Sequence, residues 1–435
     1  MPYFSEAKQR AAAVRLCEHL GAHLDGHFSV RLWDGSILPM GPNASQQHVV
    51  VINDPGVIGT LLRKPSAETA LLHFARGALD IEGDLIDFIL TARERRTSKA
   101  LKKVRKTYLL RQLLPFLTAK TGQLARSPGF EGDATGQARE TADNKDFIQF
   151  HYDLSNEFYG LFLGEEMVYS CGYFRDATNS IDQAQHDKLE MICRKLRLQP
   201  GERFLDIGCG WGALVCHAAR HHGVQAHGVT LSEAQLAFAK EKVKRLGLMD
   251  RVHLELRDYT TLEGSWDKIA SIGMFEHIGL AHMETYFRHI NSLLSERGLL
   301  LNHGICRRAK GHKRRRGKVR PEKKLILKYI FPGGELDHVG HTVDMMEVCG
   351  FEVHDVESWR EHYALTTQRW YRALMERKAE ALRHVSPEKF RLWALYLAGV
   401  SIGFTQGSLG ICQVLGSKRQ KGPSPVPLTR DDLYR

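Results

Sequence analysis

A glycine-rich turn that follows an apolar strand is the feature that most constrains this chain. Residues 204–212 read FLDIGCGWG, so Gly208, Gly210 and Gly212 stand at alternate positions after the acid Asp206. Glycines let the backbone approach a ligand closely, and the last of them lets a helix pack against the strand. The GxGxG spacing is one residue short of the dinucleotide-binding GxGxxG. The stretch therefore predicts a strand, a ligand-binding turn and a helix.

Strand-like and helix-like stretches alternate around this turn. The strand candidates are FLDIG (204–208), QAHGVTLS (225–232), VHLELRDY (252–259), DKIASIG (267–273) and GLLLNHGI (298–305). Such alternation predicts a parallel sheet with crossover helices, and nearly continuous apolar strands suit burial on both faces. We therefore expect an α/β fold with a doubly wound, Rossmann-like sheet.

The residues at the strand ends distinguish between nucleoside ligands. The second strand ends without the acid that NAD requires for its ribose about 20 residues after the glycines. After the third strand, the Asp258 carboxylate suits an adenine amino group and the Tyr259 ring suits stacking on an adenine face. Asp206 suits the cationic amino group of a ligand. This is the class I methyltransferase pattern, with a final antiparallel strand, and the expected ligand is S-adenosyl-L-methionine.

Two segments carry the basic character of the chain. Of a net charge of +11, residues 93–111 contribute +8 and residues 307–324 contribute +10, so the remainder is net acidic. Such clusters predict an anionic partner surface. An RNA methyltransferase is one alternative, but no aromatic residues suited to base stacking interleave with the run at 307–324. We therefore expect an anionic membrane surface as partner and no nucleic acid.

The cysteines and the apolar stretches indicate the compartment. The eight cysteines include no CxxC pair, so we expect no metal site and no disulfides, and reduced thiols fit a cytoplasm. The first residues lack the apolar region of a signal peptide. Residues 392–417 are uncharged, but polar residues interrupt them. They predict a buried helix, a turn and a strand rather than a membrane span.

Composition divides the chain into three parts. Residues 1–117 mix helical and strand-like pieces, which predicts a small N-terminal α+β domain that docks on a membrane. Residues 118–144 are polar and glycine-rich, which is typical of a flexible linker. Residues 145–435 contain the alternating pattern and predict the catalytic domain.

Motifs in nearly every part of the chain resemble the cyclopropane-fatty-acyl-phospholipid synthase family. They are ALDIEGDL (78–85), HYDLSNEFYGLFL (151–163), MVYSCGYF (167–174), FLDIGCGWG (204–212), GVTLSEAQ (228–235), GMFEHIG (273–279), KYIFPGGEL (328–336), HYALTTQRWYRAL (362–374) and PLTRDDLY (427–434). The resemblance implies transfer of a methyl group from S-adenosylmethionine to a cis double bond of a phospholipid acyl chain. Loss of a proton then closes a cyclopropane ring.

The resemblance also implies which residues are catalytic. In this family a bound bicarbonate ion is taken to be the base, and the residues that match its binding motif are Cys171, Glu276, His303, Ile305 and Tyr363. We expect Glu276 to accept from the bicarbonate O–H while His303 and Tyr363 donate to its other oxygens. Ile305 would contribute its backbone. Taken alone, His303 is equally well a core histidine, Cys171 a small buried hydrophobe and Tyr363 a helix-packing residue.

Four further residues match the family's contacts to S-adenosylmethionine, namely Tyr169, Ser170, Thr230 and Gln235. The resemblance implies a homodimer. Because the implied substrate lies in a membrane, we expect the basic residues 93–111 and 307–324 to hold the protein peripherally on the inner face of the cytoplasmic membrane. A related fatty-acyl methyltransferase that gives a methyl-branched or methylene product stays open. The position of the double bond and the headgroup also stay open.

Overall fold

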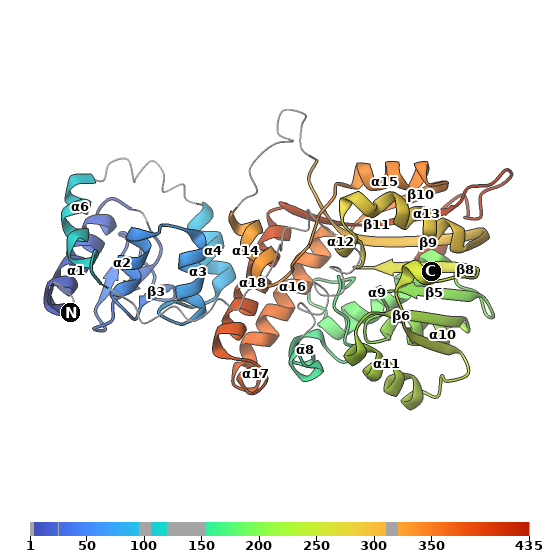
Figure 1. Ribbon diagram of the computed structural model, residues 1–435, viewed down its shortest axis with the longest axis horizontal. Helices are drawn as coiled ribbons and strands as arrows, with labels where there is room; N and C mark the ends of the chain where they lie inside the picture. Colours follow the sequence, from blue (N-terminus) through green and yellow to red (C-terminus); the bar gives the residue numbers. More distant parts are fainter. Residues whose placement is uncertain (1–3, 25, 95–105, 120–153, 310–320, 435) are drawn as a thin grey trace. The chain divides into compact units, whose positions relative to one another are not determined.

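The computed structural model describes residues 4–24, 26–94, 106–119, 154–309 and 321–434 (Figure 1). These residues form two compact units. The first contains the described part of Met1–Gly129 together with Arg320–Leu325 and Val385–Ile402; the second contains the described parts of Phe130–Val319, Ile326–His384 and Gly403–Arg435. From residue 120 onward, the predicted linker lies outside the described residues, so its boundaries stay a prediction.

The first unit is built on a four-stranded sheet with the order β2-β1-β3-β4. Its strands are β1 (Ser29–Arg31), β2 (Ile37–Pro39), β3 (Val49–Ile52) and β4 (Leu79–Glu82). Its helices are α1 (Glu6–Gly21), α2 (Gly56–Arg63), α3 (Ala67–Ala75), α4 (Leu85–Glu94), α6 (Lys106–Leu113) and the 3-10 helix η1 (Leu114–Phe116). Apolar side chains of α1, β1 and η1 form its core. The small α+β unit predicted from the sequence is confirmed.

The second unit is built on a seven-stranded sheet with the order β10-β11-β9-β8-β5-β6-β7. The strands are β5 (Arg203–Ile207), β6 (Gln225–Thr230), β7 (Val252–Leu256), β8 (Trp266–Ile272), β9 (Leu294–Arg307), β10 (Phe351–Ser358) and β11 (Leu409–Lys418). β11 pairs antiparallel with both β9 and β10, whereas β5 to β9 pair in parallel. The doubly wound sheet with a final antiparallel strand is therefore confirmed.

Helices cover both faces of this sheet. The helices that lie wholly in the second unit are α8 (Asn156–Leu163), α9 (Ile181–Leu196), α10 (Ala213–His222), α11 (Glu233–Arg245), η2 (Tyr259–Thr261), α12 (Phe275–Ile278), η3 (Leu280–His282), α13 (Met283–Leu293), α15 (Val339–Val348), α16 (Arg360–Glu376), α17 (Lys378–His384) and η5 (Asp431–Leu433). Two more helices, α14 (Pro321–Tyr329) and α18 (Pro387–Thr405), have residues in both units. Successive strand residues point to opposite faces, so Phe204 belongs to an apolar cluster with residues of α9, α10 and α11, whereas Leu205 belongs to a cluster with residues of α13.

The uncharged stretch 392–417 folds as its pattern predicted. It forms most of α18, a turn and most of β11, and β11 is inserted between β9 and β10. Among the described residues, no helix combines the length and the apolarity that crossing a membrane requires. Of the two basic segments, residues 95–105 and 310–320 lie outside the described part of the chain.

Candidate active site

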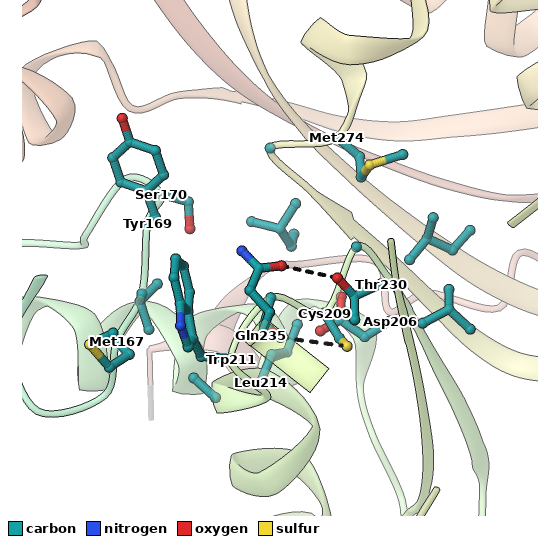
Figure 2. A pocket seen from close by; sticks show the side chains of 18 of the residues that line it. Met167, Tyr169, Ser170, Asp206, Cys209, Trp211, Leu214, Thr230, Gln235 and Met274 are labelled. Carbon is teal, nitrogen blue, oxygen red and sulfur yellow. Dashed lines mark hydrogen bonds between the residues drawn. The ribbon is translucent and has the colours of Figure 1, made fainter. Parts of the chain in front are cut away.

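A pocket opens at the carboxyl ends of the central strands β5, β6 and β8 (Figure 2). It encloses about 970 Å³, part of which is open to solvent. Eight of the ten residues predicted to contact the ligand line it: Tyr169, Ser170, Asp206, Gly208, Gly210, Thr230, Gln235 and Tyr259. Gly212 and Asp258 do not line it. Open α/β sheets bind their ligands at this edge, so the fold places the pocket where a nucleoside ligand is expected.

Each glycine of the 208–212 turn lacks a side chain for a different reason. All three have positive φ angles, of 80° at Gly208, 53° at Gly210 and 81° at Gly212. A Cβ atom at Gly208 would lie 2.4 Å from Cγ of Met274, and one at Gly212 would lie 2.9 Å from Cβ of Ala239 in α11. A Cβ atom at Gly210 would meet nothing within 4 Å. Gly210 therefore leaves room for a ligand, whereas Gly212 allows helix packing.

A buried pair of opposite charges forms the floor of the pocket. Asp206 is the penultimate residue of β5 and is 3% exposed, and its Oδ1 has no hydrogen-bond partner among the described residues. Burial raises the pKa of Asp206 to about 7, although the neighbouring Lys188 acts in the opposite direction. Lys188 of α9 donates from Nζ to Oγ of Ser170 at 3.0 Å, and burial lowers its pKa to about 8. An unpartnered carboxylate oxygen here fits a ligand that brings an ammonium group.

Thr230 and Gln235 present an amide to the same pocket. The Thr230 hydroxyl donates to Oε1 of Gln235 at 3.0 Å (Figure 2). Ser232 caps α11 by accepting from the backbone N–H of Gln235 at 3.3 Å, and this hydrogen bond fixes the backbone position from which the Gln235 side chain extends. Because the amide oxygen is engaged by Thr230, the amide nitrogen of Gln235 is the group that is oriented for a ligand acceptor.

Asp258 and Tyr259 take different positions at the rim. Tyr259 lines the pocket, and its ring packs edge-on against Tyr286 with a centroid distance of 5.5 Å. Oδ1 of Asp258 accepts from the backbone N–H and the hydroxyl of Thr260, at 2.9 and 2.8 Å, and so caps η2. This cap holds the segment that carries Tyr259. The predicted contact of Asp258 with an adenine stays a prediction.

Aromatic rings form one side of the pocket. Tyr169 and Trp211 lie together there in Figure 2. The ring of Trp370 lies 5.2 Å from that of Tyr169, and the ring of Tyr363 lies 6.0 Å from that of Trp370. Aromatic faces attract cations. The wall therefore suits a positively charged ligand and extends from the pocket to one of the predicted catalytic residues.

Glu276 and Ile305 are brought into direct contact. Glu276 lies in α12, immediately after β8, and its Oε1 accepts from the backbone N–H of Ile305 in β9 at 2.7 Å. The side chain is buried, and Oε2 has no partner in the described part of the chain. Burial raises the pKa of Glu276 to about 7. The hydrogen bond from the Ile305 N–H lowers this pKa, but its effect is smaller than that of burial.

His303 is held by a chain of two hydrogen bonds. Lys195 of α9 donates from Nζ to Oε1 of Gln413 at 2.7 Å, and Nε2 of Gln413 lies 2.9 Å from Nδ1 of His303. Lysine can only donate, so the Gln413 oxygen faces Lys195 and its N–H faces His303. Nδ1 of His303 must then accept, which places the imidazole hydrogen on Nε2.

The Nε2–H group of His303 is a donor without a partner among the described atoms. The residue is fully buried, and burial, with Lys188 and Lys195 nearby, holds its pKa well below the usual range. His303 is therefore a neutral imidazole with a fixed hydrogen.

Trp359 connects the remaining predicted catalytic residues. The Cys171 thiol lies 3.7 Å from the carbonyl oxygen of Trp359, and the same carbonyl accepts from the backbone N–H of Tyr363 at 3.0 Å. The Trp359 ring lies edge-on to His303 at 5.5 Å. Burial raises the pKa of Cys171 above its ordinary value, so the thiol is not ionised at neutral pH.

The catalytic candidates adjoin the pocket without lining it. Gly273, Met274 and His277 line the pocket, and Glu276 lies between the last two. The backbone N–H of Gly273 donates to the carbonyl oxygen of His303 at 2.9 Å. The turn after β8 is thus shared by the pocket and by the group that contains Glu276 and His303.

Sequence reasoning missed Lys188, Lys195 and Gln413. Lys188 and Lys195 stand seven residues apart in α9, so both fall on one helix face, and both are 2% exposed. The sequence did contain a signal for these two lysines, because helical periodicity assigns both positions to the buried face of α9. No local signal identifies Gln413, because its partners lie 110 and 218 residues away in the sequence.

Comparisons with known proteins agree with this geometry. The sequence model of the family described as mycolic acid cyclopropane synthetase matches residues 139–414. A probable fatty acid methyltransferase of Pseudomonas putida is 36% identical over 412 residues, which cover 93% of this chain and 96% of that protein. The cyclopropane-fatty-acyl-phospholipid synthase of Escherichia coli K12 is 36% identical over 268 residues, which cover 62% of this chain and 66% of that protein.

A solved structure extends the likeness to the fold. A mycolic acid cyclopropane synthase complexed with SAH and CTAB aligns with a TM-score of 0.60 and 32% identity, over 63% of this chain and 98% of that chain. The seven-stranded sheet, the glycine turn and the unpartnered acid at its floor all fit a nucleoside-containing ligand with an ammonium group. The chain therefore belongs to the mycolic acid cyclopropane synthetase family and is an S-adenosylmethionine-dependent methyltransferase.

Proposed function

We propose that this enzyme is a cyclopropane fatty acid synthase. In this proposal it transfers a methyl group from S-adenosylmethionine to a cis double bond of a membrane phospholipid acyl chain, and a bound bicarbonate ion assists the deprotonation that closes the ring. The observation that carries the proposal is a pair of buried polar atoms beside the pocket, Oε2 of Glu276 and Nε2–H of His303, which lack partners among the described residues.

The first step is methyl transfer. S-adenosylmethionine, when bound, supplies an electrophilic methyl group, and the π electrons of the alkene form the new C–C bond as the C–S bond breaks. Asp206 and the amide nitrogen of Gln235 orient the donor, and the ring of Tyr169, which packs against Trp370, faces the positive charge. Asp206 and Gln235 are buried, which limits the access of water that would otherwise compete with a weakly nucleophilic alkene.

The second step is removal of a proton from the transferred carbon. Bicarbonate, when bound, supplies the base, and the electrons of the C–H bond form the second ring bond. An ion with one O–H donor and further acceptor oxygens satisfies both unpartnered atoms, because Glu276 Oε2 accepts and His303 Nε2–H donates. In this arrangement Cys171, Ile305 and Tyr363 complete the surroundings of the ion.

A second candidate is a fatty-acyl methyltransferase that releases a methyl-branched or methylene product. The relative from Pseudomonas putida, which matches along nearly the whole chain, is named a probable fatty acid methyltransferase. Such an enzyme shares the first step and differs in which proton leaves.

One assay separates the two candidates. Purified protein is mixed with S-adenosylmethionine, bicarbonate and vesicles of cis-unsaturated anionic phospholipid, and the fatty acids are analysed by gas chromatography and mass spectrometry. A ring product one CH₂ heavier supports the first candidate, and a branched or methylene product supports the second. We expect Glu276→Gln to lose the ring product, whereas Glu284→Gln, at an exposed position of α13, retains it. A Glu276→Gln variant with full activity would contradict the proposed site.

We also propose that the enzyme works as a homodimer on the inner face of the cytoplasmic membrane. The basic segments 93–111 and 307–324 support the membrane association, because each basic residue near an anionic bilayer contributes about 1 kcal/mol of binding. Co-sedimentation with anionic vesicles that disappears in high salt is the expected result. Preferential binding to RNA at the same salt would favour the RNA methyltransferase, and a monomer in gel filtration would argue against the dimer.

A further inference from the structure

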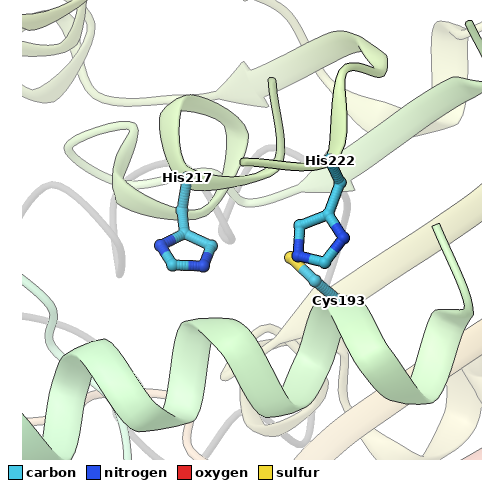
Figure 3. A group of neighbouring side chains, drawn as sticks. All are labelled: Cys193, His217 and His222. Atoms are coloured by element: carbon cyan, nitrogen blue, oxygen red, sulfur yellow. The ribbon is translucent and has the colours of Figure 1, made fainter. Parts of the chain in front are cut away.

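Helices α9 and α10 bring nitrogen and sulfur donors together at residues that do not line the pocket. Cys193 of α9 and His217 and His222 of α10 each offer one donor atom, and these atoms lie within 4.8 Å of one another. Figure 3 shows both imidazoles projecting from one helix toward the other, with the Cys193 sulfur close to the His222 ring. Two of these residues are buried, and the third is partly exposed.

A carboxylate lies at the point where the imidazoles converge. Oε2 of Glu190, one helical turn from Cys193, lies 3.1 Å from Nε2 of His217 and 3.1 Å from Nε2 of His222. Its other oxygen, Oε1, accepts from Nε of Arg194 at 2.7 Å, which fixes the orientation of the carboxylate. The carboxylate therefore lies next to both imidazoles, and the Cys193 sulfur lies within 4.8 Å of a nitrogen of each imidazole.

Two exposed histidines lie at the mouth of this cluster. The rings of His186 and His221 lie 5.2 and 4.6 Å from the ring of His217. They offer further imidazole donors between solvent and the buried pair, and so provide a route of entry for a cation.

A hydrogen-bonded network without an ion is the simpler explanation, because neutral imidazoles can donate to Glu190. That network needs neither a thiol within reach of the same nitrogens nor two further imidazoles at the entrance. A tetrahedral zinc ion uses four ligands of these types, and its ligand atoms lie about 3.3–3.8 Å apart, given bonds of about 2.0–2.3 Å. Side-chain movements of about 1 Å would bring the present donors to that separation.

We propose that Cys193, His217, His222 and Glu190 form a binding site for a zinc-like divalent cation, separate from the methyl-transfer site. On binding, the Cys193 sulfur forms a bond to the cation and its proton leaves to solvent. The mixed nitrogen, sulfur and oxygen donors favour zinc or cobalt over magnesium or calcium, which prefer oxygen ligands.

The site would clamp two helices that border the pocket. α9 supplies Lys188 and Leu189 to the pocket lining, and α10 supplies Ala213 and Leu214. An ion that binds only the folded chain stabilises it, and this stabilisation grows with the logarithm of the ratio of the free ion concentration to its dissociation constant. We therefore expect zinc to stabilise the protein whether or not it affects turnover.

The test uses tag-free, full-length protein that has been stripped with a chelator. Zinc is added, excess is removed by dialysis and bound metal is measured by mass spectrometry; cobalt is titrated in parallel and followed by absorption. We expect about one bound zinc ion, a rise in the thermal midpoint and a thiolate-to-cobalt absorption band. His222→Gln should weaken binding at least about tenfold, and Cys193→Ser should abolish the band.

His253→Gln is the matched control. His253 belongs to a more exposed group on β6 and β7, with His227 and Glu255, whose donor atoms are similarly close. This variant should bind zinc like the wild type. The proposal is overturned if the wild type retains no zinc, if His253→Gln rather than His222→Gln loses it, or if the cobalt band persists in Cys193→Ser. His222 is partly exposed, and glutamine can still donate to Glu190, so this variant is expected to fold.

Discussion

At the scale of single residues, the candidate site is marked by polar atoms that the protein buries without partners. Nearly all buried polar groups in folded proteins are hydrogen-bonded. Within the described part of this chain, Oδ1 of Asp206, Oε2 of Glu276 and Nε2 of His303 are among a larger number of exceptions, and these three lie at or beside one pocket. Leaving such atoms unpaired costs stability, so their position indicates where ligand atoms bind.

The hydrogen on His303 can be tested by changing Gln413 to Glu. A carboxylate at this position accepts from both Lys195 and His303, so the imidazole hydrogen should move from Nε2 to Nδ1. Nitrogen NMR of the histidine-labelled protein should show this exchange, and the ring-forming activity should fall by about 10-fold or more, because the donor toward the proposed bicarbonate is lost.

Glu357→Gln is the control for this tautomer. Glu357 is the ion-pair partner of Lys195, and its loss leaves Lys195 still donating to Gln413. The hydrogen should therefore stay on Nε2 of His303. If the NMR signals of His303 are the same in Gln413→Glu as in the wild type, the hydrogen-bond chain described above is wrong.

The burial of Glu276 predicts a dependence of stability on pH. Its pKa is about 7 in the folded protein and 4.5 in the unfolded chain, so folding favours the protonated form. The stability that this group contributes is complete below pH 4.5 and is lost as the pH rises through 7. Each pKa unit corresponds to about 1.4 kcal/mol, so the loss is on the order of 3 kcal/mol.

Glu276→Gln should remove this loss, because glutamine does not ionise. In urea unfolding without bicarbonate or S-adenosylmethionine, the free energy of unfolding of the variant, relative to the wild type, should rise between pH 5 and pH 8. Glu284→Gln should follow the wild type at both pH values. Parallel behaviour of all three proteins would show that Glu276 is not buried as described.

At the scale of secondary-structure elements, α9 serves three groups of residues at once. Lys188 and Lys195 lie two turns apart on one face and reach the pocket and Gln413. Glu190 and Cys193 lie on another face and meet α10. One helix therefore positions the buried charges of the site. Lysines are tolerated at buried positions of α9 because Lys188 and Lys195 each donate to a polar partner.

A comparison of two glycine substitutions can separate the cost of backbone strain from an effect on ligand binding. Gly210→Ala and Gly201→Ala both place a Cβ atom at a positive φ angle, of 53° and 83°, and both Cβ atoms meet nothing within 4 Å. Each should lower the free energy of unfolding by about 1–2 kcal/mol. Only Gly210 lines the pocket, so only Gly210→Ala should weaken binding of S-adenosylhomocysteine in calorimetry. Equal affinities for the two variants would exclude a ligand from this turn.

At the scale of the whole molecule, the first unit contains more of the chain than its N-terminal part. Val385–Ile402, which includes most of α18, belongs to it. Arg391 in this segment donates from Nε to the carbonyl oxygen of Phe74 at 2.6 Å and forms an ion pair with Asp80. Its guanidinium also lies over the Phe74 ring at 4.6 Å. The unit is therefore completed by residues more than 300 positions away in the sequence.

Arg391→Ala should destabilise this unit by about 1–3 kcal/mol, because several charge-assisted contacts are lost at a largely buried side chain. Hydrogen exchange followed by mass spectrometry should show faster exchange in α3 and β4. The control is Arg288→Ala in α13, where an exposed arginine pairs with Glu284 and little change is expected. Unchanged exchange in α3 and β4 would show that Arg391 does not hold this unit together.

Much of the fold could be predicted because its signals are local. Strand and helix patterns along the second unit, the final strand over 409–418 and the glycine turn all follow from short-range periodicity and turn chemistry. Six of the ten predicted ligand residues were also local signals, because Asp206, the three glycines, Asp258 and Tyr259 follow strands whose ends a parallel sheet places along one edge. The other four, Tyr169, Ser170, Thr230 and Gln235, followed from the family resemblance, and all four line the pocket.

The sequence by itself thus determined the class of fold, the edge of the sheet that carries the site and the identity of the glycine turn. Only the tertiary structure decided the protonation of the site. Burial raises the pKa of Asp206 and Glu276, and the hydrogen on His303 is assigned through Gln413 by Lys195. Desolvation and hydrogen-bond direction depend on which atoms surround a group. Those atoms come from segments far apart in the sequence, so local sequence patterns do not predict which of them become neighbours in the folded chain.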